Sequence, residues 1–270
     1  MRYEVLCRDD ALSGDLAERF HRLAAGRGLI RSAAEPDVVV SIGGDGTMLQ
    51  AFHTFRSSLD RVAFVGIHTG RLGFFADWQA DELEQLVDCM AIYKRDETRI
   101  VRYPLVSVEI HRAAGGPIRH EALNEATVRR REGTLVAEVH LNGQLFETFR
   151  GDGFCVSSPI GSTAYNKSLG GAIIHPTLES IQITEMASIN NRVYRTVGSP
   201  IILPKHHVCD IMPKPDQPLT VTVDHLHFEW EDVVRLRCRV SDKTVSFIRY
   251  RPFPFWQRVR EGFIRNEGDE

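Results

Sequence analysis

The apolar residues of this chain change their spacing near Thr98, and that change limits the folds the chain can adopt. Before Thr98, strand-like apolar runs alternate with segments of helical spacing. After Thr98, apolar and polar residues alternate with a period of two, as in half-buried strands. The chain has 270 residues, which is enough for two domains. We therefore expect an α/β domain over residues 1–98, followed by a β-rich domain over residues 99–254.

The first region contains three strand–helix repeats. We expect strands at residues 3–7, 37–42 and 62–67, helices at 14–28, 47–55 and 81–93, and a glycine-containing loop at 68–74. Strands joined by crossover helices pair in parallel, and helices cover the sheet. This pattern predicts a Rossmann-like domain with a parallel sheet.

The second region is predicted to be a β-sandwich-like domain. We expect strands at residues 105–110, 123–128, 135–141, 145–149, 153–157, 201–203, 219–223, 233–240 and 245–250. Asn142-Gly143 lies between two of these runs and predicts a tight hairpin, because a type I′ turn needs positive φ at both central residues. Residues 255–264 return to helical spacing, with Trp256, Val259 and Phe263 on one face. We expect residues 255–270 to pack back onto the first domain.

Composition excludes several classes of protein. The net charge of −3 gives no basic surplus for binding nucleic acid. The longest apolar runs have the length of strands, so no membrane span is predicted. The N-terminus enters a strand pattern without a secretory signal, which indicates the cytoplasm. The five cysteines include no C-x-x-C pair, so neither a disulfide framework nor a zinc site is indicated.

A glycine-rich turn follows the second predicted strand: Gly43-Gly44-Asp45-Gly46-Thr47. Ligands of parallel α/β sheets bind beyond the carboxyl ends of the strands. Glycines let the backbone approach a phosphate, and the start of the next helix offers unpaired N–H groups. The alternative is a plain turn in which Asp45 caps the helix. Because Leu49 stands where a third glycine would fall, the turn is not the dinucleotide fingerprint of a hydride-transferring enzyme.

A second polar segment runs from Arg150 to Gly171 and is dense in glycine and hydroxyl residues. This density suits a polar ligand, although a strand followed by a Ser/Thr-capped turn would have a similar composition. Residues 161–168 nearly spell a phosphate-binding P-loop, but Asn166 replaces the glycine that must precede the lysine, and we reject that interpretation. Tyr165 is either a stacking aromatic or a core residue.

Two further clusters carry polar groups in strand-like surroundings. Asn124-Glu125 lies between apolar residues, where at least one side chain is expected to face inward and to need a partner, unless the strand lies at an edge. Asp224-His225 follows another strand, with His227 two residues on. No third ligand is arranged near these histidines, so a metal site is not favoured.

Taken together, the Gly-Gly-Asp-Gly turn, Asn124-Glu125 and the segment from Gly151 to Gly171 resemble the three motifs of the NAD kinase family, in order and at suitable separations. The chain closely resembles the compact NAD kinases of low-GC Gram-positive bacteria, through His68-Thr69-Gly70, the segment 186–192 and Phe255-Trp256. The resemblance implies a kinase that transfers phosphate from ATP, or from polyphosphate, to the 2′-hydroxyl of the adenosine ribose of NAD. It also implies Mg²⁺ bound to ATP and a homotetramer.

The resemblance also assigns roles to individual residues. Asp45 would be the catalytic carboxylate that orients the hydroxyl and accepts its proton. The ATP phosphates would lie against Gly43, Gly44, Gly46 and Thr47, with His225 as a further contact. NAD would contact Asp45, Gly46, Phe74, Asn124, Glu125, Arg150, Asp152, Thr163, Ala164, Tyr165, Asn166, Lys167, Ser168 and Ala187. Among these, Arg150 would reach a site shared between subunits.

Two other functions use part of the same sequence features. A lipid kinase of the diacylglycerol kinase type shares the Gly-Gly-Asp-Gly turn, but the Ser162-Thr163-Ala164-Tyr165 segment argues against it. A non-catalytic NAD-binding regulator would keep Asn124-Glu125 and could dispense with Asp45. The chain departs from the usual family pattern at Ile160, at residues 187–189 and at His225, where threonine, a Pro-His stretch and glycine are common.

Overall fold

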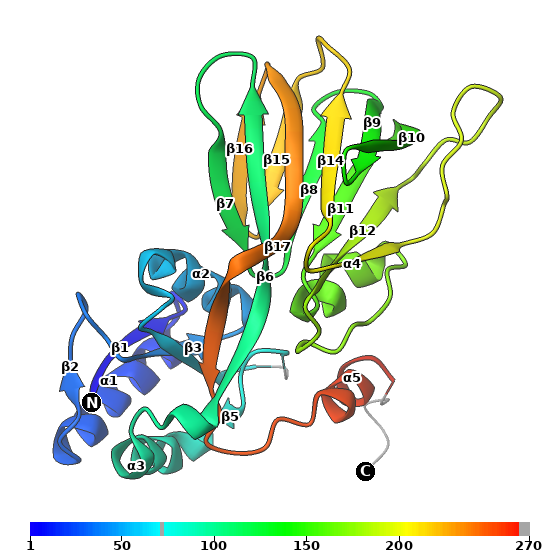
Figure 1. Ribbon diagram of the computed structural model, residues 1–270. Helices are drawn as coiled ribbons and strands as arrows, with labels where there is room; N and C mark the ends of the chain where they lie inside the picture. Colours follow the sequence, from blue (N-terminus) through cyan, green and yellow to red (C-terminus); the bar gives the residue numbers. More distant parts are fainter. Residues whose placement is uncertain (71–72, 265–270) are drawn as a thin grey trace. The chain divides into compact units, whose positions relative to one another are not determined.

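The chain divides into two compact units, each described here by itself (Figure 1). The computed structural model describes residues 1–70 and 73–264. The first unit contains residues 1–102 and the chain from Val245 onward, and the second contains residues 103–244. The first unit is α/β and the second is built of strands, so the expected fold class is confirmed.

The first unit is built on a parallel sheet. Its elements are β1 (Arg2–Cys7), α1 (Ala11–Gly26), β2 (Ile30–Arg31), β3 (Val38–Gly43), α2 (Asp45–Thr54), β4 (Ala63–His68), β5 (Trp78–Gln79), α3 (Leu83–Tyr93) and α5 (Phe255–Phe263), with single 3-10 turns at Arg56–Ser58, Ala80–Glu82 and Glu97–Arg99. The strand order is β4-β3-β1-β2, and β5 also pairs with β4, all in parallel. All six residues of β3 are buried, as expected for a strand with helices on both faces.

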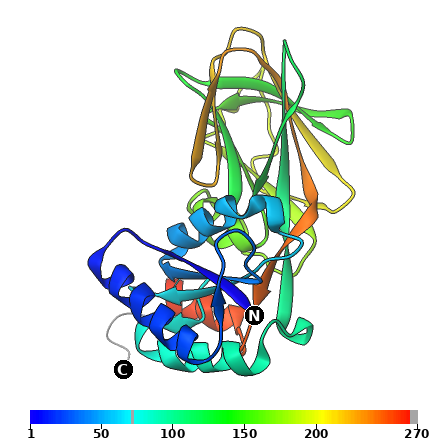
Figure 2. The same ribbon diagram turned by 90° about the vertical axis from the view of Figure 1, so that its left-hand side faces the viewer.

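Helices cover both faces of this sheet. The buried side chains of α1 and α3, among them Phe20 and Leu86, form one core cluster with the strands. The buried face of α2, which includes Met48 and Phe52, is not part of that cluster. Figure 2 shows α2 on one side of the sheet and α1 and α3 on the other. α1 begins three residues before the predicted start at residue 14, because the Asp10 side chain accepts the Ser13 N–H and caps the helix.

The second unit is a sandwich of two antiparallel sheets. Its elements are β7 (Ile118–Ala122), β8 (Glu125–Arg130), β9 (Leu135–Leu141), β10 (Gln144–Gly151), β11 (Gly153–Ser157), α4 (Tyr165–Ser168), β12 (Ser180–Met186), β13 (Ile201–Pro204), β14 (Val208–Pro213), β15 (Leu219–Val223) and β16 (Leu226–Trp230), with a 3-10 turn at Ile160–Thr163. Two longer strands, β6 (Ile100–Arg112) and β17 (Val233–Ile248), begin or end in the first unit.

One sheet of the sandwich has the order β13-β12-β11-β8-β15-β16, and the other contains β10-β9-β14-β17 with β6 and β7. Apolar side chains from both sheets form a single core cluster that includes Val128, Phe149, Phe154 and Val221. Between β9 and β10, Asn142 and Gly143 have φ of 52° and 79°, so the predicted hairpin turn is confirmed.

The structure differs from the expected elements in several places: β2, β5, β7, β12, β14 and β16 were not predicted, and the last strand and the last helix differ from expectation. β17 is one strand of 16 residues, although two strands were predicted at 233–240 and 245–250. Its end pairs with β4 at Ser246 and Phe247, so the chain returns to the first unit before residue 255. α5 buries Phe255 and Arg258, whereas Trp256 of the predicted inner face is 59% exposed.

Some predicted segments extend beyond the described part of the chain. Arg71 and Leu72 of the predicted loop 68–74 lie outside the described residues, as do residues 265–270 of the predicted C-terminal segment. Within residues 1–70 and 73–264, no helix combines the length and the apolar character needed to cross a bilayer.

Candidate active site

Asp45 lies where β3 ends and α2 begins, at the carboxyl edge of the parallel sheet. Gly44 is the N-cap of α2 and makes no side-chain hydrogen bond, so the first N–H groups of the helix are not capped by it. A side chain at Gly43 would meet Thr47, whose Cβ would lie 3.0 Å from the added carbon. The predicted turn therefore has a packing requirement for glycine at position 43.

Glycines 44 and 46 leave open space on the outside of the turn. A Cβ built at either position would meet no other atom of the described residues within 4 Å. Neither glycine has φ in the left-handed region, so neither is required by backbone conformation. The turn is thus bare on the side from which a phosphate could approach the N-terminus of α2.

Two backbone N–H groups hold the Asp45 carboxylate in place. Phe74 N–H donates to Oδ2 at 2.9 Å, and Phe75 N–H donates to Oδ1 at 3.3 Å. A side chain at Gly73 would place its Cβ only 2.6 Å from Asp45 Cγ, so only glycine allows this approach. The carboxylate is therefore fixed by the segment 73–75 and does not cap its own helix, which was the alternative interpretation of the turn.

The electrostatic surroundings of Asp45 act in opposite directions on its pKa. Burial raises the pKa, and this is the largest effect. The two N–H groups, the Arg258 guanidinium and His68 each lower it. The net pKa lies above the usual value for aspartate, so the carboxylate binds a proton more strongly than an exposed one does.

In the second unit, Asp224 organises the chain around Asn124 and Glu125. Its carboxylate accepts the backbone N–H groups of Leu123, Asn124 and Glu125 at 2.9, 2.8 and 3.3 Å. Ser158 N–H donates to Asn124 O at 2.8 Å, which brings the start of the long second motif beside this pair. Asp224 has φ of 54°, a left-handed conformation that aspartate tolerates.

Glu125 is the most perturbed carboxyl of this group. Burial raises its pKa to about 8, and the neighbouring Asp224 carboxylate adds to the rise. Its Oε2 atom is buried and has no hydrogen-bond partner among the described residues. A buried acceptor of this kind is costly unless a donor reaches it. Glu125 is thus suited to bind a ligand that brings a hydroxyl or an amine.

The residues of the 3-10 turn and α4 differ in what they offer a ligand. Thr163 is buried, Ala164 is partly buried, and Tyr165 is 40% exposed. Tyr165 N–H donates to the Glu125 carboxyl, so these two predicted site residues lie together. Lys167 and Ser168 are exposed.

Asn166 lies inside the second unit. Its Oδ1 accepts the Thr184 hydroxyl at 2.7 Å, and its Nδ2 donates to backbone carbonyls. A Cβ at Gly171 would collide with this side chain. Asn166 therefore holds the turn in shape from within, and its predicted contact with NAD stays a prediction.

Arg150, Asp152 and Ala187 form a separate group at the other end of β11. Asp152 N–H donates to Met186 O at 2.9 Å, and Ile189 N–H donates to Arg150 O at 2.7 Å. Arg150 also lies over the Tyr194 ring, 5.6 Å from its centroid. The last residue of β11, Ser157, pairs with Glu125, and its first residue, Gly153, pairs with Arg129. The group therefore lies at the opposite end of β11 from Glu125.

The remaining predicted site residues are distributed over both units. Phe74 belongs to the first unit, where its ring stacks on Phe263 of α5 at 5.3 Å between centroids. His225 is exposed and follows Asp224 in the second unit. Within residues 1–70 and 73–264, no group of three or more His, Cys, Asp or Glu side chains is arranged to hold a metal ion.

Comparison with known proteins identifies the family. Residues 27–93 match the ATP-NAD kinase N-terminal domain, and residues 123–250 match the ATP-NAD kinase C-terminal domain. The chain belongs to the NAD kinase family. It is 51% identical to NAD kinase 1 of Bacillus cereus over 99% of this chain and 100% of that protein. It is 53% identical to an NAD kinase of Lysinibacillus sphaericus, again over 99% of this chain and 100% of the relative.

Solved structures show the same fold. A yeast NADH kinase, solved as a complex with NADH, has a TM-score of 0.80 at 17% identity and covers 98% of this chain and 89% of its own. An NAD kinase from Archaeoglobus fulgidus, solved in complex with ATP, has a TM-score of 0.76 at 22% identity and covers 97% of this chain and 99% of its own. These two likenesses concern the fold alone.

Membership of the NAD kinase family confirms the predicted enzyme class, a transferase that phosphorylates NAD. It does not favour the lipid kinase or the non-catalytic regulator. Sequence reasoning noticed Asp224 but gave it no role, and it did not find Gly73, Asp77, Arg249 or Arg258. Gly73 follows the described His68–Gly70 segment and could have been suspected as a close-approach glycine. The charged residues gave no local signal, because their partners are distant in sequence.

Proposed function

We propose that Asp45 is the carboxylate that orients the 2′-hydroxyl of the adenosine ribose of NAD and accepts its proton. The observation that carries this proposal is the position of Asp45 at the carboxyl end of β3, where two backbone N–H groups fix its carboxylate beside the bare N-terminus of α2. Ligands of parallel α/β sheets bind at this edge, and helix N-termini attract phosphate. The acceptor carboxylate and the phosphate-binding element would thus lie side by side.

In the proposed reaction the ribose oxygen attacks the γ-phosphorus of ATP. A new phosphorus–oxygen bond forms, the bond to the β,γ-bridging oxygen breaks, and the hydroxyl proton passes to an Asp45 carboxylate oxygen. The products are NADP and ADP, and Asp45 releases the proton to water. Burial raises the pKa of Asp45 and so favours acceptance of the proton. In a loose transition state, the fixed position of the carboxylate contributes more than its basicity does.

The second unit is proposed to bind NAD. The unpartnered Oε2 of Glu125 suits a ribose hydroxyl, and the neighbouring Asn124 would contact adenine. Tyr165, which is partly exposed, offers a face for stacking, and Thr163 and Ser168 complete the adenosine side, with Ala187 as a further contact. Asp152 lies one β11 length away from Glu125 and, together with Ala164, would contact the nicotinamide end, because an extended dinucleotide can bridge such a span.

Mg²⁺ is proposed to arrive bound to ATP. Hard divalent cations at phosphoryl-transfer sites are held by substrate phosphates and one or two carboxylates, and keep several waters. The ion would neutralise charge on the transferring phosphoryl group, alongside the N–H groups of residues 44–47 and His225. ATP is the proposed donor, with polyphosphate as the alternative.

Assembly and location are also proposals. We propose a homotetramer in which Arg150 contributes to a site shared between subunits. We place the enzyme in the cytoplasm, since its five cysteines are all free, as is usual in a reducing compartment.

The test is NADP formation from NAD and Mg-ATP, read with an NADP-specific dehydrogenase, for the wild type and for Asp45→Asn. Both proteins are first shown to fold by circular dichroism. Asparagine keeps the shape of the side chain but cannot accept the proton, so we expect the rate to fall about a hundredfold or more. Activity within a few-fold of the wild type in Asp45→Asn would remove the proposed role.

A further inference from the structure

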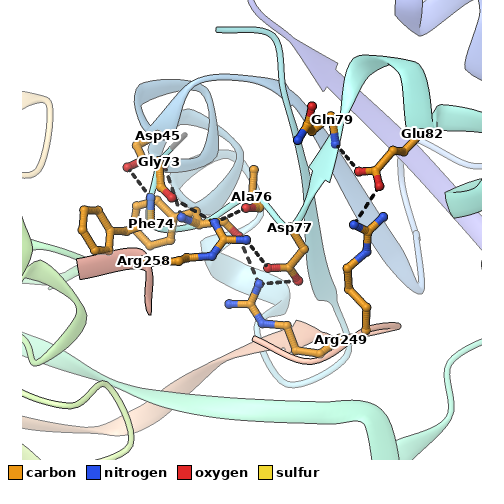
Figure 3. Close-up of polar contacts among 11 residues, drawn as sticks. Asp45, Gly73, Phe74, Ala76, Asp77, Gln79, Glu82, Arg249 and Arg258 are labelled. Carbon is orange, nitrogen blue, oxygen red and sulfur yellow. Dashed lines mark hydrogen bonds and ion pairs between the residues drawn. The ribbon is translucent and has the colours of Figure 1, made fainter. Parts of the chain in front are cut away.

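The segment from Gly73 to Asp77 lies between Asp45 and a pair of buried arginines (Figure 3). On one side its N–H groups hold the Asp45 carboxylate. On the other side its carbonyl groups accept hydrogen bonds from Arg249 and from Arg258 of α5. All of these contacts lie within the first unit. The segment is therefore fixed from both sides.

One peptide group connects the two sides directly. Arg258 Nη1 donates to Gly73 O at 2.9 Å, and the N–H of the same peptide group, which belongs to Phe74, donates to Asp45 Oδ2 at 2.9 Å. A cation at the carbonyl end polarises the peptide and makes its N–H a stronger donor. The Arg258 charge is thus transmitted to the Asp45 carboxylate through a single amide.

The arginine is itself held in position. The Asp77 side chain is fully buried, and it accepts Arg249 Nη1 at 2.7 Å and Arg258 Nη2 at 3.2 Å. Arg258 also donates to Ala76 O, so its planar fork satisfies two carbonyls and a carboxylate at once. A lysine ammonium cannot reproduce this pattern, because it is a point charge on a flexible stem.

We propose that Arg258 is a positioning residue of the kinase reaction, held by Asp77 and Arg249, which sets the orientation of the Asp45 carboxylate through the Gly73–Phe74 peptide group. This inference rests on the proposed role of Asp45. It assigns a function to α5, whose buried face consists of Phe255 and Arg258 and does not match the apolar stripe of its sequence.

The effect of Arg258 on Asp45 can be measured through the pKa of the Asp45 carboxyl. Among residues 1–70 and 73–264, Arg258 on α5 and His68 at the end of β4 act on Asp45 through their charges, and both lower its pKa. Removing the Arg258 charge therefore raises the pKa of Asp45 further. If Asp45 acts as the ionised base, the acidic limb of the pH–rate profile moves to higher pH. A change that only loosened the fold would reduce the burial of Asp45 and so would not move this limb to higher pH.

The experiment measures kcat, KM for NAD and the pH dependence of kcat for Arg258→Met and Arg258→Lys. We expect kcat to fall about ten- to a hundredfold in Arg258→Met, which is the typical cost of a misplaced reacting group, with KM for NAD changed less than threefold. Its acidic limb shifts to higher pH. Arg258→Lys keeps the charge but loses the fork, so its limb stays near that of the wild type while kcat remains reduced.

Arg251→Met is the matched control. Arg251 belongs to the same C-terminal segment, and the variant loses a partly exposed ion pair with Glu82 at 2.9 Å, together with the contact over the Trp78 ring, but no contact, among the described residues, with the segment that holds Asp45. Its kcat and pH profile are expected to match those of the wild type. If Arg251→Met shifts the acidic limb as far as Arg258→Met does, the effect is general to the segment and the proposal is overturned.

A second comparison separates this inference from the role of Asp45. Arg258→Met is combined with Asp45→Asn, and the double variant should lose little beyond Asp45→Asn alone, because both act on one group. If Asp45→Asn is fully active, the proposed function fails. If Asp45→Asn is impaired but Arg258→Met keeps wild-type kcat and pH profile, only the inference fails. Should Arg258→Met not fold, Arg258→Lys decides: wild-type kcat would overturn the proposal.

Discussion

Glu125 binds a proton more tightly in the folded chain than an ordinary glutamate does. Burial raises its pKa to about 8, and the Asp224 carboxylate adds to the rise. A carboxyl whose pKa is raised on folding stabilises the fold fully below its unfolded pKa, and this stability is lost as pH rises through the folded pKa. The contribution of Glu125 to the free energy of unfolding of the unliganded chain therefore decreases as the pH rises from about 4.5 to about 8.

Glu125→Gln should separate stability from NAD binding. Glutamine imitates the protonated carboxyl, so we expect the unliganded variant to be more stable than the wild type at pH 8, by on the order of 2 kcal/mol, with little difference at pH 4. Above pH 8, where Glu125 is ionised, NAD affinity should fall about tenfold or more, because a charge-assisted hydrogen bond is lost. Urea unfolding at both pH values and NAD titration measure the two effects. Equal stability of the two proteins at pH 8 would contradict this account of Glu125.

At the scale of elements, the start of α2 combines helix stability with the space that a phosphate needs. Gly46 lies in the first turn without a left-handed backbone, and a Cβ there meets no described atom within 4 Å. Gly46→Ala should therefore stabilise the chain by about 0.5–1 kcal/mol, since alanine favours helix over glycine. Activity should nevertheless fall about tenfold or more, because the methyl group occupies the approach of the phosphate.

Gly14→Ala is the control for this prediction. Gly14 lies in α1, and a Cβ there also meets no described atom within 4 Å. It should give a similar gain in melting temperature with unchanged NADP formation. If Gly46→Ala is as active as Gly14→Ala, the proposed phosphate site at the turn is wrong.

The attachment of α5 depends on a buried ion-pair cluster. Asp77→Ala would leave Arg249 and Arg258 without their shared carboxylate, and breaking such a buried pair costs about 3–5 kcal/mol. Glu82→Ala removes a partly exposed partner of Arg251 and should cost about 1 kcal/mol or less. Urea unfolding of both variants compares them. A loss in Asp77→Ala no larger than in Glu82→Ala would contradict the anchoring role of the cluster.

Sequence patterns predicted the elements that have clear periodicity. β1, β3, β4 and the β9–β10 hairpin lie where apolar spacing and the Asn-Gly pair placed them. β7, β12, β14 and β16 were not predicted. β7 has three polar residues in succession, Arg119, His120 and Glu121, whereas β16 alternates strictly between apolar and polar residues and was missed all the same. β17 was divided in two at Asp242 and Lys243, whose exposed side chains look like a turn in sequence although the strand continues through them.

Sequence patterns also predicted only those residues of the candidate site that belong to a local motif. Local patterns placed Asp45 just after a strand and Glu125 inside one, although β8 begins only at Glu125. The arginines that hold the segment beside Asp45 come from more than 170 residues away, so no spacing rule connects them to it. Their placement follows only from the tertiary fold, since a charged residue on an amphipathic helix normally indicates a solvated face.

At the scale of the whole molecule, the second unit exposes large apolar side chains that suit contacts between subunits. Leu145, Phe146 and Ile202 are 57%, 45% and 50% exposed, and Val193 is 76% exposed. We predict that sedimentation equilibrium gives about four times the 30.5 kDa of one chain, and that Phe146→Asp gives smaller species. A wild-type protein that sediments as a single chain at micromolar concentration would contradict the tetramer and the shared-site role of Arg150.

The account depends most on Asp45, and a single-turnover experiment tests it directly. Enzyme in excess, saturated with Mg-ATP, is mixed with limiting NAD, and NADP formation is followed by rapid quench for the wild type and for Asp45→Asn. We predict that the rate constant of Asp45→Asn falls about a hundredfold or more while NAD affinity changes less than threefold, because the carboxylate acts on the reacting hydroxyl. A rate constant within threefold of the wild type would contradict the central claim.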